Sequence, residues 1–231
     1  MVIITGIVPI FVMLIILIIK PLIYDGKTFF SSFYPSFVFL FYLHFLVPIT
    51  SLFFGTGIIA DEAEDNTLQF LLTRPAHRAL IFLTKLLTNV FVGSLIMIIS
   101  MLITFFIAQL GSTEQTPNAF SFLMGASGTV ILGLAVYSTL FSLLGGTIRH
   151  PLIVGLLFVF GWEKIITYVP GNAQYFTIMN YLQALYPGKS FIDTPIFSAD
   201  ISILTAIIVL FTLTILFGGV ACYLPGLKEY R

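Results

Sequence analysis

The sequence predicts an all-α, polytopic membrane protein with six transmembrane helices, a short amphipathic helix on one side of the bilayer and a short re-entrant segment on the other. Of its 231 residues, 58% are hydrophobic and only 9% are charged, whereas soluble domains carry roughly 25% charged residues. The apolar residues form runs of about 20, the length at which a helix crosses the hydrocarbon. Four of the ten acidic and three of the ten basic residues lie together in the stretch 59–85.

The composition excludes several classes of protein. So few charges cannot cover a water-facing surface, and the whole chain, 1–231, is therefore predicted to be a single transmembrane domain. Ten basic and ten acidic residues leave no basic patch for nucleic acid. Cys222 is the only cysteine, which excludes an intrachain disulfide and a Cys-rich metal site. The N-terminus lacks a positive leader region, so its apolar stretch is predicted to be a retained span.

Six apolar stretches are long enough to span the bilayer, and polar or turn-forming residues separate them. The predicted spans are residues 2–23, 37–60, 86–109, 121–146, 151–169 and 201–224. The second span contains His44, an ionisable group and therefore a candidate functional residue. A neutral histidine hydrogen-bonded inside the bundle is the simpler interpretation. Pro48 removes a backbone donor and is predicted to kink the same helix.

Small residues recur every four positions along the fourth span. Because residues four apart share one helix face, this face would let a neighbouring helix approach closely. The helix-packing residues predicted in this way are Ser121, Gly125, Thr129 and Gly133.

A long polar interruption, 170–199, follows the fifth span. Trp162, near the end of that span, is a predicted interface anchor, and Glu163 and Lys164 beside it are expected at headgroup depth. Residues 173–186 have a helical period but are too few to cross the bilayer. We therefore expect an interfacial or re-entrant helix there.

Six spans place both termini on the same side of the membrane. The loops after spans two and four lie on that side too, and together these segments hold six of the ten basic residues. They are Arg74, Arg78, Lys85, Arg149, Lys228 and Arg231, which include all four arginines. The positive-inside rule therefore predicts that this side is cytoplasmic in the cell membrane and that 170–199 is external.

The stretch between spans two and three has the pattern of a short helix outside the bilayer. Acidic residues 61–65 stand at its start, where negative charge complements a helix N-terminus. Leu68, Leu71 and Leu72 follow at i, i+3 and i+4 and form one apolar face, and Pro75 ends the pattern. Either the membrane surface or a groove in a partner could cover this face, and the pattern alone leaves both open.

The same stretch contains an acidic pair, then Glu-x-x-Thr-Leu, then Leu-Leu-Thr-Arg-Pro-x-x-Arg, and finally a lysine that opens the next span. The residues of this pattern are Asp61, Glu62, Glu64, Thr67, Leu68, Leu71, Leu72, Thr73, Arg74, Pro75, Arg78 and Lys85. The pattern resembles the cytoplasmic segment of type-2 ABC transporter permeases. The order of the spans and the external segment extend the resemblance, as layout, across nearly the whole chain.

The resemblance implies the permease subunit of an ATP-driven exporter, which forms the translocation path as a homodimer or heterodimer. A separate ATP-binding subunit would receive residues 61–78 as the coupling helix. The coupling residues would be Asp61, Glu62, Glu64, Thr67, Leu68, Leu71, Leu72, Arg74, Pro75 and Arg78. This chain would hold no cofactor, since ATP and Mg belong to the partner. The Gly-Lys-Ser at 188–190 lacks the first glycine of a phosphate-binding loop.

One feature departs from the family pattern. Family members usually begin with a cytoplasmic amphipathic helix before the first span, whereas here the span opens at Val2. The external residues 173–186 would correspond to the re-entrant helices that close the outer exit. The few charges within the spans favour an apolar or weakly polar substrate, such as a lipid, a hydrophobic peptide or an amphipathic drug, over a small ion.

Other functions fit the sequence less well than the permease. A passive channel or a structural membrane subunit fits the spans but gives the amphipathic loop no role. The Gly-Ala-Ser-Gly at 125–128 resembles the nucleophile motif of rhomboid proteases, yet none of the three histidines, His44, His77 and His150, lies in the sixth span, where that family places its base. Three scattered histidines also make a zinc protease site a poor explanation.

Overall fold

The computed structural model describes residues 2–23, 29–64, 78–110, 119–148, 150–167, 172–188 and 201–223, and all regular structure in these ranges is helical. The longer elements are α1 (Val2–Ile23), α3 (Val47–Glu64), α5 (Arg78–Leu110), α6 (Ala119–Thr147) and α10 (Ile203–Tyr223). The shorter elements are α2 (Phe29–Phe37), η1 (Val38–Leu46), α7 (Pro151–Leu156), η2 (Leu157–Glu163), α8 (Lys164–Thr167), η3 (Asn172–Phe176) and α9 (Ile178–Leu185).

Each of the six predicted spans falls on a helix. Within the described residues, four helical stretches are long and apolar enough to cross a bilayer, namely Phe33–Gly57, Leu80–Leu110, Ala119–Thr147 and Ile203–Cys222, while Thr5–Ile19 forms a shorter apolar helix. The fifth predicted span corresponds to the successive helical elements α7, η2 and α8, which end at Thr167. An all-helical membrane protein with several spans is therefore confirmed, and the number six stays a prediction.

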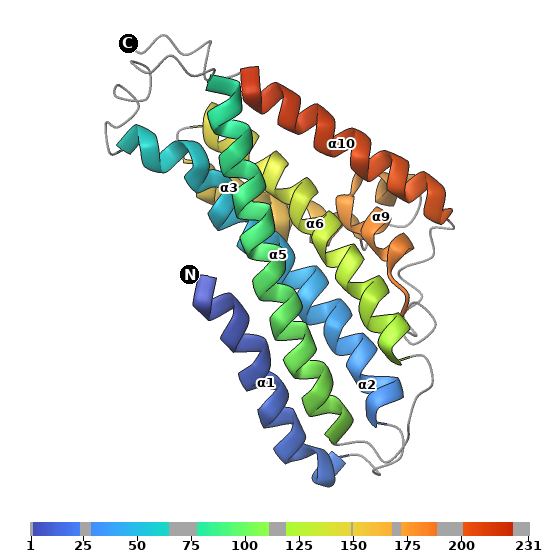
Figure 1. Ribbon diagram of the computed structural model, residues 1–231. Helices are drawn as coiled ribbons and strands as arrows, with labels where there is room; N and C mark the ends of the chain where they lie inside the picture. The colour runs from blue at the N-terminus through green and yellow to red at the C-terminus, as the bar shows by residue number, and fades with distance from the viewer. Residues whose placement is uncertain are drawn as a thin grey trace.

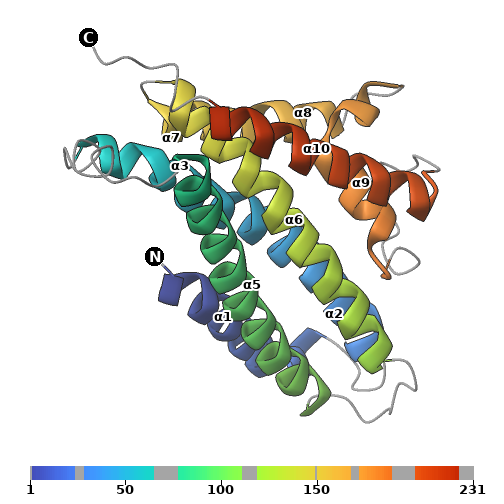
Figure 2. The ribbon, with the colours of Figure 1, turned by 45° about the horizontal axis from the view of Figure 1, so that its top comes forward.

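The helices form an elongated bundle (Figure 1). Helices α1, α5 and α6 and the continuous helix from α2 to α3 run along its length, and α10 crosses one side of α6. The contact between α3 and α6 is the most extensive, followed by those of α1 with α5 and of α10 with α6. Figure 2 shows α9 lying beside α6 and α10.

The interior of the bundle holds aromatic side chains whose polar atoms find partners. The Tyr34 hydroxyl donates to the Met101 carbonyl at 3.0 Å, and Tyr42 is hydrogen-bonded to Ser100 at 2.9 Å. The outer surface, in contrast, exposes large apolar residues such as Phe91 and Ile215. Lipid tails are as apolar as these side chains, so such a surface is stable in a bilayer and not in water.

The second predicted span is distorted next to Pro48. Residues Val38–Leu46 form a π-helix, in which the Val47 amide bonds to the Tyr42 carbonyl five residues earlier. Proline has no N–H, and its ring crowds the carbonyl four residues before it, so the regular α pattern is disfavoured there. The helix that was predicted to kink at Pro48 thus has a π-helical segment just before the proline.

Helix α3 continues beyond the predicted end of the span at residue 60. It runs to Glu64, since no glycine or proline follows Gly57 until Pro75 and Ala and Glu favour helix. The acidic residues 61–64 therefore lie at the end of α3. The prediction that they begin a separate helix is wrong.

Glycines set the distance between α3 and α6. A Cβ added at Gly55 would lie 2.8 Å from the Phe141 Cβ and 2.9 Å from the Ser138 carbonyl oxygen. One added at Gly145 would lie 2.9 Å from the Thr56 carbonyl oxygen. Real Cβ atoms do not approach backbone so closely, so each helix uses a glycine to let the other come near.

Gly55→Ala is therefore expected to destabilise the protein. The added methyl meets backbone of α6 and must push the helices apart, and such overpacking costs about 1–3 kcal/mol. Thermal unfolding in detergent, followed by size-exclusion fluorescence, would measure the loss.

Gly128→Ala is the matched control, because nothing lies within 4 Å of a Cβ at Gly128 on α6. Alanine is favoured over glycine in a helix by about 0.5–1 kcal/mol, so this variant should be as stable as the parent or more so. Equal Tm values for the two variants would contradict the close packing of α3 on α6.

Candidate functional site

The predicted coupling residues lie where α3 ends and α5 begins. Asp61, Glu62 and Glu64 are in the last turns of α3, and Arg78 is the first residue of α5. Both helix ends lie at the same end of the bundle (Figure 1). The remaining predicted coupling residues lie outside the described residues: Thr67, Leu68, Leu71, Leu72, Arg74 and Pro75.

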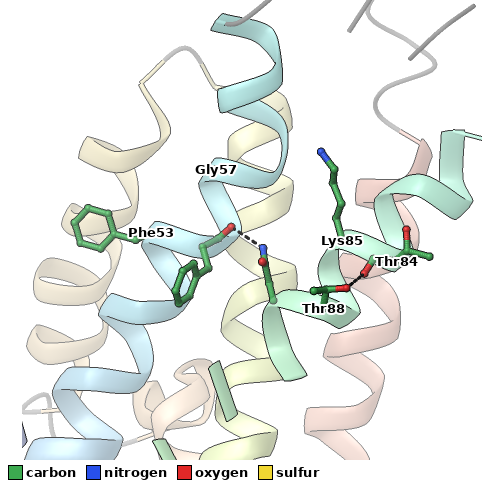
Figure 3. Close-up of a pocket in the computed structure, with 7 residues that line it drawn as sticks. Phe53, Gly57, Thr84, Lys85 and Thr88 are labelled. Atoms are coloured by element: carbon green, nitrogen blue, oxygen red, sulfur yellow. Dashed lines mark hydrogen bonds between the residues drawn. The ribbon is translucent and has the colours of Figure 1, made fainter. Parts of the chain in front are cut away.

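A cavity of about 390 Å³ opens between these two helices (Figure 3). Its lining consists of Phe53, Phe54 and Gly57 from α3 and Thr84, Lys85, Thr88 and Asn89 from α5. The Asn89 side chain donates to the Phe54 carbonyl at 3.2 Å and so ties the helices together. The Lys85 side chain extends upward from α5 in Figure 3, away from Thr88. The cavity therefore has a polar wall on α5 and a largely apolar wall on α3.

Residues 51–56 of α3 are packed closely against the rest of the bundle. Besides the two glycine contacts with α6, the Leu52 side chain fills the space beside Gly155 of α7, where an added Cβ would overlap it at 2.1 Å. The Ser51 hydroxyl reaches the Leu134 carbonyl of α6 at 3.5 Å. A displacement of α3 would consequently be passed to α6 and α7.

A buried carboxylate joins α6 to the segment 172–188. Glu163 is 3% exposed, and its carboxylate accepts hydrogen bonds from the Tyr137 hydroxyl and, at 3.3 Å, from the Ile178 amide at the start of α9. Glu163 is thus buried among the helices, as is usual for an acidic residue within a span, while its expected headgroup depth stays a prediction.

The segment 172–188 lies along one side of the bundle, and α9 packs against the bundle interior. Gln183 is hydrogen-bonded to His44 at 3.4 Å, as expected for a histidine hydrogen-bonded inside the bundle, and the Tyr186 hydroxyl donates to the Pro35 carbonyl at 2.6 Å. The predicted helix is divided into the 3-10 turn η3 and α9. Tyr175 and Phe176 of the turn are exposed, whereas Ile178, Met179, Leu182 and Tyr186 are buried.

Comparison with known proteins identifies the family. A family model described as ABC-2 family transporter protein matches residues 2–223. The chain belongs to this family. No curated protein and no solved structure matches it.

The protein is therefore a multi-pass membrane permease subunit of an ABC transporter. ABC-2 permeases are transport subunits that are not themselves catalytic, and they act with an ATP-binding subunit. The resemblance seen in residues 61–85 is thus confirmed at the level of the family.

The predicted packing face on α6 lies against α3 and the segment 172–188. A Cβ added at Gly125 would lie 3.1 Å from Pro187, and one at Gly133 would lie 3.0 Å from Val47 of α3 and 3.2 Å from Leu182 of α9. The Thr129 hydroxyl donates to the Gly125 carbonyl of its own helix at 3.0 Å. Ser121, the remaining member of the predicted face, is exposed.

The described part of the permease offers no support for the enzyme alternatives. The Ser127 hydroxyl donates to the Leu123 carbonyl of its own helix at 2.7 Å and also contacts the Met101 sulfur at 3.7 Å. Within the described ranges no three His, Cys, Asp or Glu side chains gather to hold a metal ion.

Glu163→Leu is expected to loosen α9. The change removes the acceptor of two buried donors, Tyr137 and the Ile178 amide, and a buried donor without a partner costs about 1–3 kcal/mol. Backbone amides of Ile178–Leu185 should then exchange with deuterium about 10-fold faster, as measured by mass spectrometry of the protein in nanodiscs.

Glu163→Gln is the matched control. Its amide oxygen is still an acceptor for these donors, so α9 should keep most of its protection. Equal exchange in the leucine and glutamine variants would show that the carboxylate does not hold α9.

Proposed function

We propose that this permease forms the translocation path of an exporter with six spans and both termini in the cytoplasm of the cell. It would act as a homodimer or heterodimer with ATP-binding subunits docked against residues 61–78. The observation that carries the proposal is the ABC-2 family match over residues 2–223, together with the coupling pattern at the junction of α3 and α5. ATP and Mg would be bound by the partner.

The packing of α3 gives the proposed coupling a route. A partner that moves residues 61–78 would pull on the end of α3. Helices α3 and α6 are in close contact at Gly55 and Gly145, so α6 would have to move with α3. Packed helices respond to such a pull by shifting between discrete arrangements rather than by deforming. The apolar turn Leu68, Leu71 and Leu72 would provide docking area, and the charges would set the register on the ATPase surface.

The substrate proposed for this path is apolar or weakly polar. The predicted spans hold few charged residues, and the Glu163 carboxylate is hydrogen-bonded to Tyr137 and to the Ile178 amide. A lipid, a hydrophobic peptide or an amphipathic drug suits a path built from such spans better than a small hydrated ion.

Arg74→Glu is expected to uncouple ATP hydrolysis from transport. Placing a like charge across a docking surface costs several kcal/mol, so transport by reconstituted permease and ATPase should fall at least about 10-fold, while the ATPase subunit still hydrolyses ATP. Lys228→Glu, the same reversal in the C-terminal tail, is the control and should transport normally.

Copurification tests the proposal independently of the substrate. A separate ATP-binding subunit should copurify with the permease, and a change of Leu68, Leu71 and Leu72 to Ser should abolish this. Unimpaired transport in Arg74→Glu would contradict the coupling role. Ion conductance with no ATPase subunit bound would favour the passive channel instead.

A further inference from the structure

The 3-10 turn η3 faces outward at one end of the segment 172–188. Phe176 is 77% exposed and Tyr175 is also exposed, whereas the next two residues, Thr177 and Ile178, are buried. The boundary between the outside and the inside of the bundle therefore falls between residues 176 and 177. The two aromatic rings of η3 meet whatever surrounds the protein at this point.

The exposed turn adjoins an apolar outer surface that belongs to the fifth predicted span. Gly155, Val159 and Glu163 of that span are buried at intervals of four residues, so this side of the helix points inward. The rest of the span exposes large apolar residues, namely Ile153, Leu157, Phe160, Trp162 and Ile165. Such a surface is stable against lipid tails. Since η3 contacts α8, the last part of this span, the rings of η3 continue the lipid-facing surface.

The position of η3 along the chain places it where hydrocarbon gives way to headgroups. Helix α8 ends at Thr167, and the turn-forming residues Pro170 and Gly171 follow in the sequence. Trp and Tyr are enriched at this level of a membrane, because their rings are apolar and one edge is polar. Exposed Trp162 and Tyr175 match that preference, so the bilayer boundary fits this surface better than water does.

Hydrogen bonds join η3 firmly to α9. The amide and the hydroxyl of Thr177 donate to the Gln174 carbonyl at 3.1 Å and 2.7 Å. The Tyr181 hydroxyl reaches back from α9 and donates to the Tyr175 carbonyl at 2.9 Å. The turn and the start of the helix are therefore one unit, and whatever holds η3 also holds α9.

We propose that η3 is a membrane anchor for α9, with Tyr175 and Phe176 inserted between headgroups and hydrocarbon beside the fifth predicted span. The bilayer holds the start of α9 from outside the bundle, and Glu163, which accepts from the Ile178 amide, holds it from inside. This anchor requires only that the chain crosses a membrane. It depends neither on the direction of transport nor on the coupling role of residues 61–78.

Tryptophan fluorescence tests where η3 lies, because Trp162 is the only tryptophan of the chain. The double variant Trp162→Phe, Phe176→Trp carries one fluorophore, at a position exposed enough to accept it. In vesicles its emission should be quenched strongly by phosphatidylcholine brominated near the headgroup end of the acyl chains, and weakly by acrylamide in the water.

Phe211→Trp in the same Trp162→Phe background is the matched control. Phe211 is exposed near the middle of α10, so a fluorophore there should respond most to bromine near the methyl ends of the chains. Quenching at position 176 by acrylamide alone would place η3 in water. Quenching by neither agent would mean that protein, such as a second copy of the chain, covers it. Either result would overturn the proposal.

Hydrogen exchange tests whether the anchor holds α9. Phe176→Asp places a charge against the acyl chains, so η3 should leave the boundary, and the amides of Ile178–Leu185 should exchange several-fold faster in nanodiscs. Phe176→Trp keeps an aromatic ring that favours the interface and should retain the parent rates. Unchanged exchange in Phe176→Asp would overturn the anchoring of α9.

Discussion

The close contact of α3 with α6 is the constraint on which the other features depend. It requires a glycine on each helix, Gly55 facing Phe141 and Gly145 facing Thr56. Lipid exerts no hydrophobic force that would drive two apolar helices together, so van der Waals contact over a tight interface must stabilise the pair. This contact fixes α3 and thereby positions the cavity that Phe53, Phe54 and Gly57 line.

The burial of Glu163 beside the segment 172–188 is explained by the need of buried polar groups for hydrogen-bond partners. The segment 172–188 is a short broken helix within the bundle, and the start of such a helix exposes backbone amides that need acceptors. Glu163 supplies an acceptor to the Ile178 amide. Tyr137 in turn donates to the same carboxylate, so the acidic group is itself hydrogen-bonded and can remain buried.

The sequence predicted the helices well and their mutual contacts poorly. Hydrocarbon thickness demands apolar runs of fixed length, so the spans were visible in composition alone. The position of Glu163 depends on Tyr137 and on Ile178, and no local pattern shows such a pairing. The spacing of Gly125 and Gly133 was visible as a stripe, whereas Gly55 and Gly145 were not singled out because each matters only through its partner helix. The cavity could not be predicted from the sequence for the same reason, since residues of both α3 and α5 form its walls.

The two helices that flank residues 61–78 both pack on α6 but differ in their other neighbours. Helix α3 is fixed to α6 and α7, whereas Phe82 and Leu86 near the start of α5 pack with Ala221 of α10, next to Leu143 of α6. The Asn89–Phe54 hydrogen bond links the two helices below this level, and the cavity lies between them. A force on the segment would therefore act between α3 and the start of α5, and α6, which contacts both helices, would receive it from either one.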